Sequence, residues 1–158
     1  MSLLLNRLMV FWMLLVAASL AMAGDEPVST GFFNNVAAGG HDVTAYHQLS
    51  PGEQAIEGEA IYTVNYKGAD WHFVTAEDSQ AFAANPESFA PAYNGHCANA
   101  LSLGEGLIPT NGQYWAIFDK QLFLFYAPRG AKRWKAAADY RVYQAEADRA
   151  WREILATR

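Results

Sequence analysis

Hydrophobic and polar residues alternate in two stretches of the chain, and each stretch predicts a β-hairpin. Residues 60–66 place an aromatic or aliphatic side chain at every second position, which is the period of a half-buried strand. A turn and a return strand at 71–74 complete this hairpin. The second hairpin is predicted at 114–118 and 121–126. Its return strand is apolar on both faces, so we expect both faces to be covered.

Three helical segments are predicted between and after these hairpins. Thr75 and Asp78 form a T-x-x-D capping box before a helix over 76–84, and the Asn-Pro pair at 85–86 ends it. A second helix is expected after Pro128. The last helix carries an apolar stripe at helical spacing, which we assign to the core. The stripe consists of Tyr140, Tyr143, Ala147, Trp151 and Ile154. The predicted fold class is α+β: a small antiparallel sheet from two hairpins, an inserted short helix, and C-terminal helices packed on it.

The first residues of the chain have the pattern of a secretory signal peptide. Arg7 gives a basic start, 8–20 is nearly unbroken apolar sequence, and Ala-Met-Ala at 21–23 is a signal-peptidase pattern. An uncleaved membrane anchor is the alternative, but a spanning helix needs roughly 20 apolar residues. We therefore expect cleavage after residue 23, a periplasmic or secreted protein, and no membrane insertion after signal cleavage.

The remainder is predicted to be one domain. We expect an N-terminal tether at 24–39, loose over 24–30 with Phe32-Phe33 docking it to the body, and a domain at 40–156. With 52% apolar and 17% charged residues, the chain is not a disordered tail. Its net charge of −5 disfavours nucleic acid as a partner.

Metal-ligating residues are concentrated in one window. All four histidines and the single cysteine, Cys97, lie between residues 41 and 97. A lone cysteine in an exported protein cannot form an internal disulfide. A thiolate beside an imidazole, as in His96-Cys97, suits Cu(I) or Zn(II). The alternatives are a buried thiol for Cys97 and a surface imidazole in a turn for His96.

The other histidines have more than one interpretation. His41-Asp42 and His47 lie in one segment, where Asp42 could orient an imidazole for a metal. Equally, Asp42 could cap the turn that begins at Val43. His72 lies between two strand aromatics and is expected to face water if they face the core.

Several ordered segments resemble the YHS domain family, in its exported, stand-alone branch. The matching segments are DVTAY at 42–46 (D-P-V-A-Y in the family), IYTVNYKG at 61–68 with WHFV at 71–74 (its sheet), FAANPESFAP at 82–91 (F-x-x-N-P-E-x-[FY]-x-P) and YNGHCA at 93–98 (Y-G-G-Y-C-A). The resemblance runs from about residue 40 to 153 and includes the later hairpin and C-terminal helix.

The resemblance implies metal binding through the cysteine, because YHS domains accompany copper-transporting ATPases and some monooxygenase subunits. Carried over by position, the site candidates are Cys97, Asp42 and Tyr46. The chain departs from the family pattern at Val43, His47 and His96. Two of these departures bring imidazoles close to the presumed site. A membrane transporter or another periplasmic protein is an implied partner.

Three hypotheses follow from the sequence. The first is a non-catalytic copper- or zinc-binding module with Cys97, His96, His47 and Asp42 as ligands or orienting groups. The second is a metal-free domain that binds a small molecule or protein partner. Its pocket would be lined by Tyr46, Tyr93 and Trp115, with Cys97. The third and weakest is a thiol enzyme using Cys97. We assign no catalytic residue, since no hydrolase or dinucleotide-binding motif is present.

Overall fold

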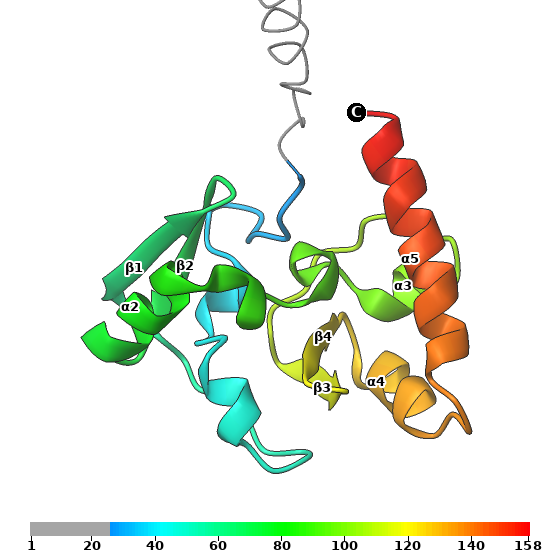
Figure 1. Cartoon of the computed structure of the whole chain (residues 1–158), viewed down its shortest axis with the longest axis horizontal. Helices are drawn as coiled ribbons and strands as arrows, with labels where there is room; N and C mark the ends of the chain where they lie inside the picture. The colour runs from blue at the N-terminus through cyan, green and yellow to red at the C-terminus, as the bar shows by residue number, and fades with distance from the viewer. Residues whose placement is uncertain (1–25) are drawn as a thin grey trace, which may run out of the picture.

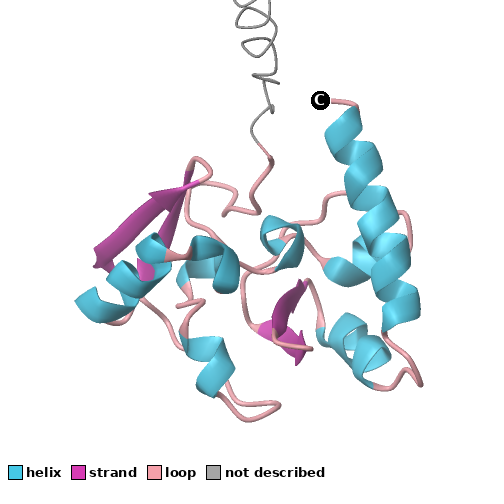
Figure 2. Cartoon of the chain, in the orientation of Figure 1, coloured by secondary structure: helices cyan, strands magenta, loops and turns pink. Residues whose placement is uncertain are grey.

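The computed structural model describes residues 26–158 and confirms the α+β fold class (Figures 1 and 2). The predicted signal peptide and its cleavage site lie outside the described residues. The strands are β1 (Glu59–Tyr66), β2 (Ala69–Phe73), β3 (Tyr114–Phe118) and β4 (Gln121–Phe125). The α-helices are α2 (Ala76–Ala84), α3 (Ala98–Ser102), α4 (Pro128–Lys135) and α5 (Arg141–Ala156). Short 3₁₀ turns are η1 (Ala38–Gly40), η2 (Ala45–Gln48), η3 (Pro86–Ser88) and η4 (Ala92–Gly95).

Each predicted hairpin is present, and each forms its own two-stranded antiparallel sheet. The first closes with Tyr66 paired to Ala69, and the second with Phe118 paired to Gln121. Asp119 and Lys120 both have positive φ, which is the geometry of a two-residue hairpin turn. The four described strands form two separate ladders, and the chain between the hairpins forms α2, α3 and the loops around them.

The helix over 76–84 and the helix start near Pro128 lie where the sequence predicted, whereas α3 was not predicted. The Thr75 hydroxyl accepts a hydrogen bond from the Asp78 backbone N–H and donates to the Asp78 carboxylate, so the capping box is confirmed. The helix α2 ends at Ala84, before the Asn-Pro pair, and α4 begins at Pro128. The apolar stripe of α5 packs into the core as expected.

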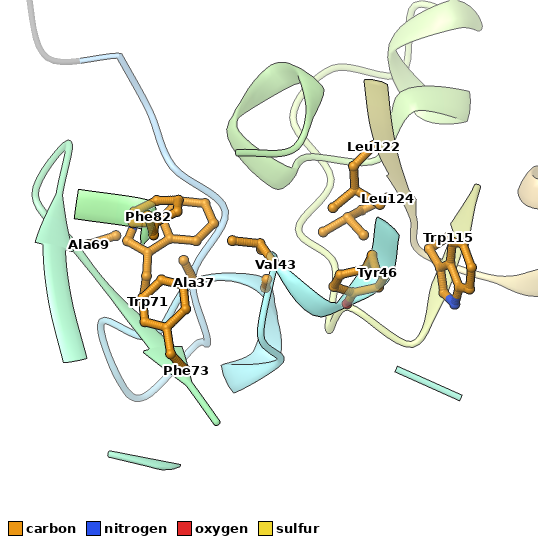
Figure 3. Close-up of a cluster of buried hydrophobic side chains, with 11 residues drawn as sticks. Ala37, Val43, Tyr46, Ala69, Trp71, Phe73, Phe82, Trp115, Leu122 and Leu124 are labelled. Atoms are coloured by element: carbon orange, nitrogen blue, oxygen red, sulfur yellow. The ribbon is translucent and has the colours of Figure 1, made fainter. Parts of the chain in front are cut away.

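The strand β4 separates two hydrophobic clusters. Leu122 and Leu124 belong to the first cluster, and Phe123 and Phe125 belong to the second. Both faces of β4 are therefore covered, as predicted. In the first cluster, Val43 lies between an aromatic group around β2 and α2 and a second group around β3 and β4 (Figure 3). The second cluster lies among β4, α3, α4 and α5.

The N-terminal segment is packed against the body, so the expectation of a loose tether is wrong for residues 26–30. Ser29 is buried, its backbone N–H donates to the Asn94 carbonyl, and its hydroxyl accepts from the Thr110 N–H at 2.9 Å. The segment is held by backbone hydrogen bonds that composition does not reveal. The aromatic pair predicted to dock it does not: Phe32 and Phe33 are 93% and 95% exposed.

Within residues 26–158, none of the helices combines the length and apolar character that crossing a membrane requires.

Candidate functional site

Cys97 caps the first turn of α3 and is enclosed. Its side chain is 4% exposed, so the buried-thiol alternative describes its position. The sulfur accepts backbone N–H groups from Ala100 at 3.5 Å and from Tyr126 at 3.3 Å. The adjoining cavity has a volume of about 40 Å³, far below the size of a small-molecule site. The sulfur therefore stabilises the junction between α3 and the end of β4.

His96 is buried under α5, so the alternative of a surface imidazole is wrong. Its Nδ1 lies 2.9 Å from the Tyr93 carbonyl oxygen, and its ring packs on Trp151. Burial lowers the pKa of His96 below its ordinary value; the Tyr93 carbonyl opposes this shift and Arg158 adds to it. The sequence marked this turn through Asn94-Gly95 but did not show that α5 covers it.

Asp42 is fully buried and makes structural hydrogen bonds. One oxygen accepts from the Thr44 N–H and hydroxyl, and the other accepts from the Val74 N–H. The capping interpretation of Asp42 is thus the one observed. No hydrogen bond joins its carboxylate to the His41 ring within residues 26–158. A carboxylate that already accepts three hydrogen bonds has little capacity left for a metal.

His47 lies on the surface beside Phe89, in a shallow groove that also includes the β3–β4 turn. Partial burial lowers its pKa. His72 alternates with two buried aromatics on β2, as predicted. No three His, Cys, Asp or Glu side chains come together in a metal-binding arrangement anywhere in residues 26–158. The predicted ligands Cys97, His96, His47 and Asp42 have separate surroundings.

The three predicted pocket aromatics are also divided. Trp115 lines a cleft. The Tyr46 ring packs edge-on against the Trp115 ring, with 5.5 Å between the ring centroids (Figure 3). Tyr46 is fully buried, and its hydroxyl donates to the Gly112 carbonyl. Tyr93 belongs to the other cluster and donates to Asp148 on α5. Burial, followed by the hydrogen bond to Asp148, raises the pKa of Tyr93.

The cleft has a volume of about 910 Å³ and lies between α4 and the loop over residues 52–57. The start of β3 forms its floor, and in Figure 1 this strand lies between the loop that follows η2 and α4. A cavity of this size is within the range of small-molecule sites. None of the sequence patterns predicted it, because its walls come from three segments far apart in the chain.

Trp115 is held rigidly in the floor of this cleft. Its indole Nε1–H donates to the Glu53 carbonyl at 3.1 Å, so the ring is fixed between β3 and the opposite loop. The Lys135 ammonium lies 5.8 Å from the centroid of the Trp115 ring, a cation–π arrangement. The indole itself is only 6% exposed, so it closes the base of the cleft, and Lys135 offers a charged group to a ligand there.

His41 adds a nitrogen acceptor that sequence reasoning did not assign to this site. Its Nδ1 lies 3.0 Å from the Ala38 carbonyl oxygen, which can only accept, so Nδ1 carries the proton. In the neutral ring Nε2 is then an acceptor, and it has no hydrogen-bond partner within residues 26–158. The ring lines the cleft. The turn η1 places it there, and no motif signals that placement.

The chain matches no protein-family model, no curated protein and no solved structure. What the cleft does is therefore inferred from its own residues: an indole floor, an ammonium, an imidazole acceptor and a polar rim. These groups can bind and orient a small organic molecule.

Proposed function

We propose that this chain is an exported YHS-type domain that binds a small organic ligand in the cleft between α4 and the loop over 52–57. The proposal includes neither a metal nor a catalytic step. The observation that carries it is the cleft itself, with a volume of about 910 Å³ over the fixed indole of Trp115. The lining combines apolar residues with charged and polar ones, so it offers both kinds of contact to a small organic molecule.

The surroundings of Cys97 favour this function over the metal-binding module. A metal at Cys97 needs other ligands within reach of the sulfur, and copper or zinc sites use three or four. The sulfur instead accepts two backbone N–H groups beside a cavity of about 40 Å³. His96, the adjacent candidate, uses Nδ1 at the Tyr93 carbonyl and packs on Trp151.

The thiol-enzyme hypothesis is supported still less. A cysteine nucleophile needs a base within hydrogen-bond reach and a path for its substrate. Within residues 26–158, the sulfur's hydrogen-bond partners are backbone N–H groups rather than an imidazole. Its 4% exposure leaves no room for a substrate at the thiol.

The family and the location rest on sequence. The ordered motifs between residues 40 and 153 support membership of the YHS family, and the apolar run with its Ala-Met-Ala end supports export. An exported binding domain of this kind would deliver its ligand to a membrane transporter or to another periplasmic protein.

The test is binding of a neutral aromatic probe to the full chain, expressed with its own leader. We expect 4-hydroxyphenylacetamide to bind, as measured by isothermal titration calorimetry and ligand-observed NMR. Ala136→Trp should abolish binding, because exposed Ala136 lines the cleft and an indole there would fill it. Ala138→Trp is the matched control, since Ala138 is exposed and lies outside the cleft lining. Absence of binding, or equal binding by both variants, would overturn the proposal.

A further inference from the structure

The charges around the cleft point to a particular ligand class. Building on the proposed function, we infer that the cleft binds a small organic carboxylate that carries a hydroxyl group at its far end. The carboxylate faces α4, and the hydroxyl faces His41. This assignment rests on the basic residues of α4, two of which form no salt bridge within residues 26–158, and on the acceptor on the opposite wall.

Basic residues are concentrated on α4 in an otherwise acidic chain. The net charge is −5, yet four of the 11 Lys and Arg residues lie in the eight residues of α4. They are Arg129, Lys132, Arg133 and Lys135. A positive wall on an acidic protein attracts anions locally, where the rest of the surface repels them.

These four basic side chains differ in the contacts that they make. Arg133 is held within the fold: it donates to Asn99 and Ser102 and lies 3.7 Å above the Tyr143 ring. Lys132 and Lys135 are exposed, line the cleft and form no salt bridge within residues 26–158. Being three residues apart on a helix, they present their ammonium groups to one side.

Lys135 places a positive charge at the base of the cleft. Its ammonium lies 5.8 Å from the centroid of the Trp115 ring, and the indole is only 6% exposed, so a ligand in the cleft meets this ammonium before it meets the indole. A charge-assisted hydrogen bond to a carboxylate is about twice as strong as one between neutral groups. Discrimination between an acid and its neutral amide is therefore expected at this position.

The opposite wall has the opposite character. Glu53 and Glu57 lie on the rim of the cleft, and Glu53 accepts the Ser50 N–H with one carboxylate oxygen. His41, whose backbone pairs with that of Glu57, offers Nε2 as an acceptor. This side repels an anion and accepts a hydroxyl proton. The two walls together fix the direction in which the ligand lies.

The test compares four probes that share one ring, on the full chain, by isothermal titration calorimetry at low ionic strength. We expect 4-hydroxyphenylacetate to bind about tenfold more tightly than 4-hydroxyphenylacetamide, a difference of about 1.4 kcal/mol. The cation tyramine should bind most weakly. Phenylacetate should bind a few-fold more weakly than 4-hydroxyphenylacetate, because it lacks the proton donated to His41. A phenol of this kind is neutral at pH 7.

A variant that lacks both lysine charges tests whether α4 causes the preference for the acid over the amide. In Lys132→Gln/Lys135→Gln, the acid and the amide should bind equally. Lys120→Gln, which removes an exposed lysine at the β3–β4 turn, should keep the preference. If wild type binds acid and amide equally, or if the double variant keeps the preference, the inference fails while the proposed function stands. Equal binding of phenylacetate and 4-hydroxyphenylacetate overturns the role of His41. If no probe binds, both proposals fail.

Discussion

The Asp42 carboxylate accepts a hydrogen bond from the Val74 backbone N–H across 2.8 Å, joining the segment before η2 to the end of β2. Its other oxygen accepts hydrogen bonds from the Thr44 backbone N–H and from the Thr44 hydroxyl. Asp42 therefore stabilises the turn that leads to Tyr46 and fixes that turn to the first hairpin. The residue that the YHS resemblance marked as a metal-site candidate connects two parts of the fold.

Replacing Asp42 is expected to destabilise the protein. Asp42→Ala leaves the Val74 and Thr44 N–H groups buried without acceptors, at a cost of about 2–4 kcal/mol in the free energy of unfolding. Asp42→Asn keeps one acceptor oxygen and should cost less. Urea unfolding followed by circular dichroism measures both. The exposed Glu105→Gln is the control and should change stability by less than about 0.5 kcal/mol. An unchanged midpoint for Asp42→Ala would contradict the structural role.

Much of the secondary structure was predictable, because local patterns decide it. The alternation in 60–66, the capping box at Thr75 and the apolar stripe on α5 each reflect a periodicity or hydrogen bond within a few residues. The separation of the hairpins into two sheets could not be predicted in this way. It depends on contacts between segments distant in sequence, such as the two faces of β4 packing on different clusters.

The candidate site was less predictable, since it is defined by proximity between distant residues. Trp115 was chosen from its sequence and does line the cleft, whereas Tyr93 belongs to the other cluster. Sequence reasoning does not assign His41 or Lys135, because nothing in the sequence around either residue shows that the fold brings it to the wall of the cleft. The histidines are close together in the sequence, but their rings lie in different surroundings.

Metal uptake distinguishes the two sequence hypotheses at Cys97. The sulfur accepts two backbone N–H groups and is enclosed, so we expect no stoichiometric copper or zinc. Added Cu(I) or Zn(II), after dialysis under reducing conditions, should leave the same low metal content per chain in wild type and Cys97→Ser. His47→Gln serves as a surface control. Near-stoichiometric metal in wild type that disappears in Cys97→Ser would restore the metal-binding hypothesis.

Stability should fall as the pH drops below neutrality, owing to His96. Burial lowers its folded-state pKa below the unfolded value of about 6.5. The unfolded chain therefore takes up the proton first, and stability present above pH 6.5 is lost as the pH falls toward the folded-state pKa. The lowered carboxylate pKa values of Glu26 and Asp119 act at lower pH, below their ordinary values of 4.5 and 3.8.

The measurement is the unfolding free energy between pH 7.5 and 5. His96→Phe keeps a ring against Trp151 and should flatten the slope relative to wild type. His47→Gln should flatten it slightly, because the pKa of that exposed histidine is also lowered. A slope in His96→Phe equal to that of wild type would show that another group controls the acid sensitivity.

Two buried tryptophans offer a matched comparison of a satisfied and an unsatisfied indole N–H. Trp71 donates to the Tyr66 carbonyl at 3.1 Å. Trp134 is equally buried, but its Nε1 has no hydrogen-bond partner within residues 26–158. A benzothienyl analogue keeps the shape of the indole and removes the N–H, so it changes the hydrogen bond without opening a cavity.

Site-specific incorporation of β-(3-benzothienyl)alanine at each position isolates this difference. At Trp71 the analogue should cost about 1 kcal/mol, because a net hydrogen bond is lost. At Trp134 it should be neutral or stabilising, because a buried donor without an acceptor is removed. Urea unfolding of the two analogue proteins gives the comparison directly, with wild type as the reference. Equal destabilisation at both positions would mean that the Trp134 N–H has an acceptor in solution, such as an ordered water.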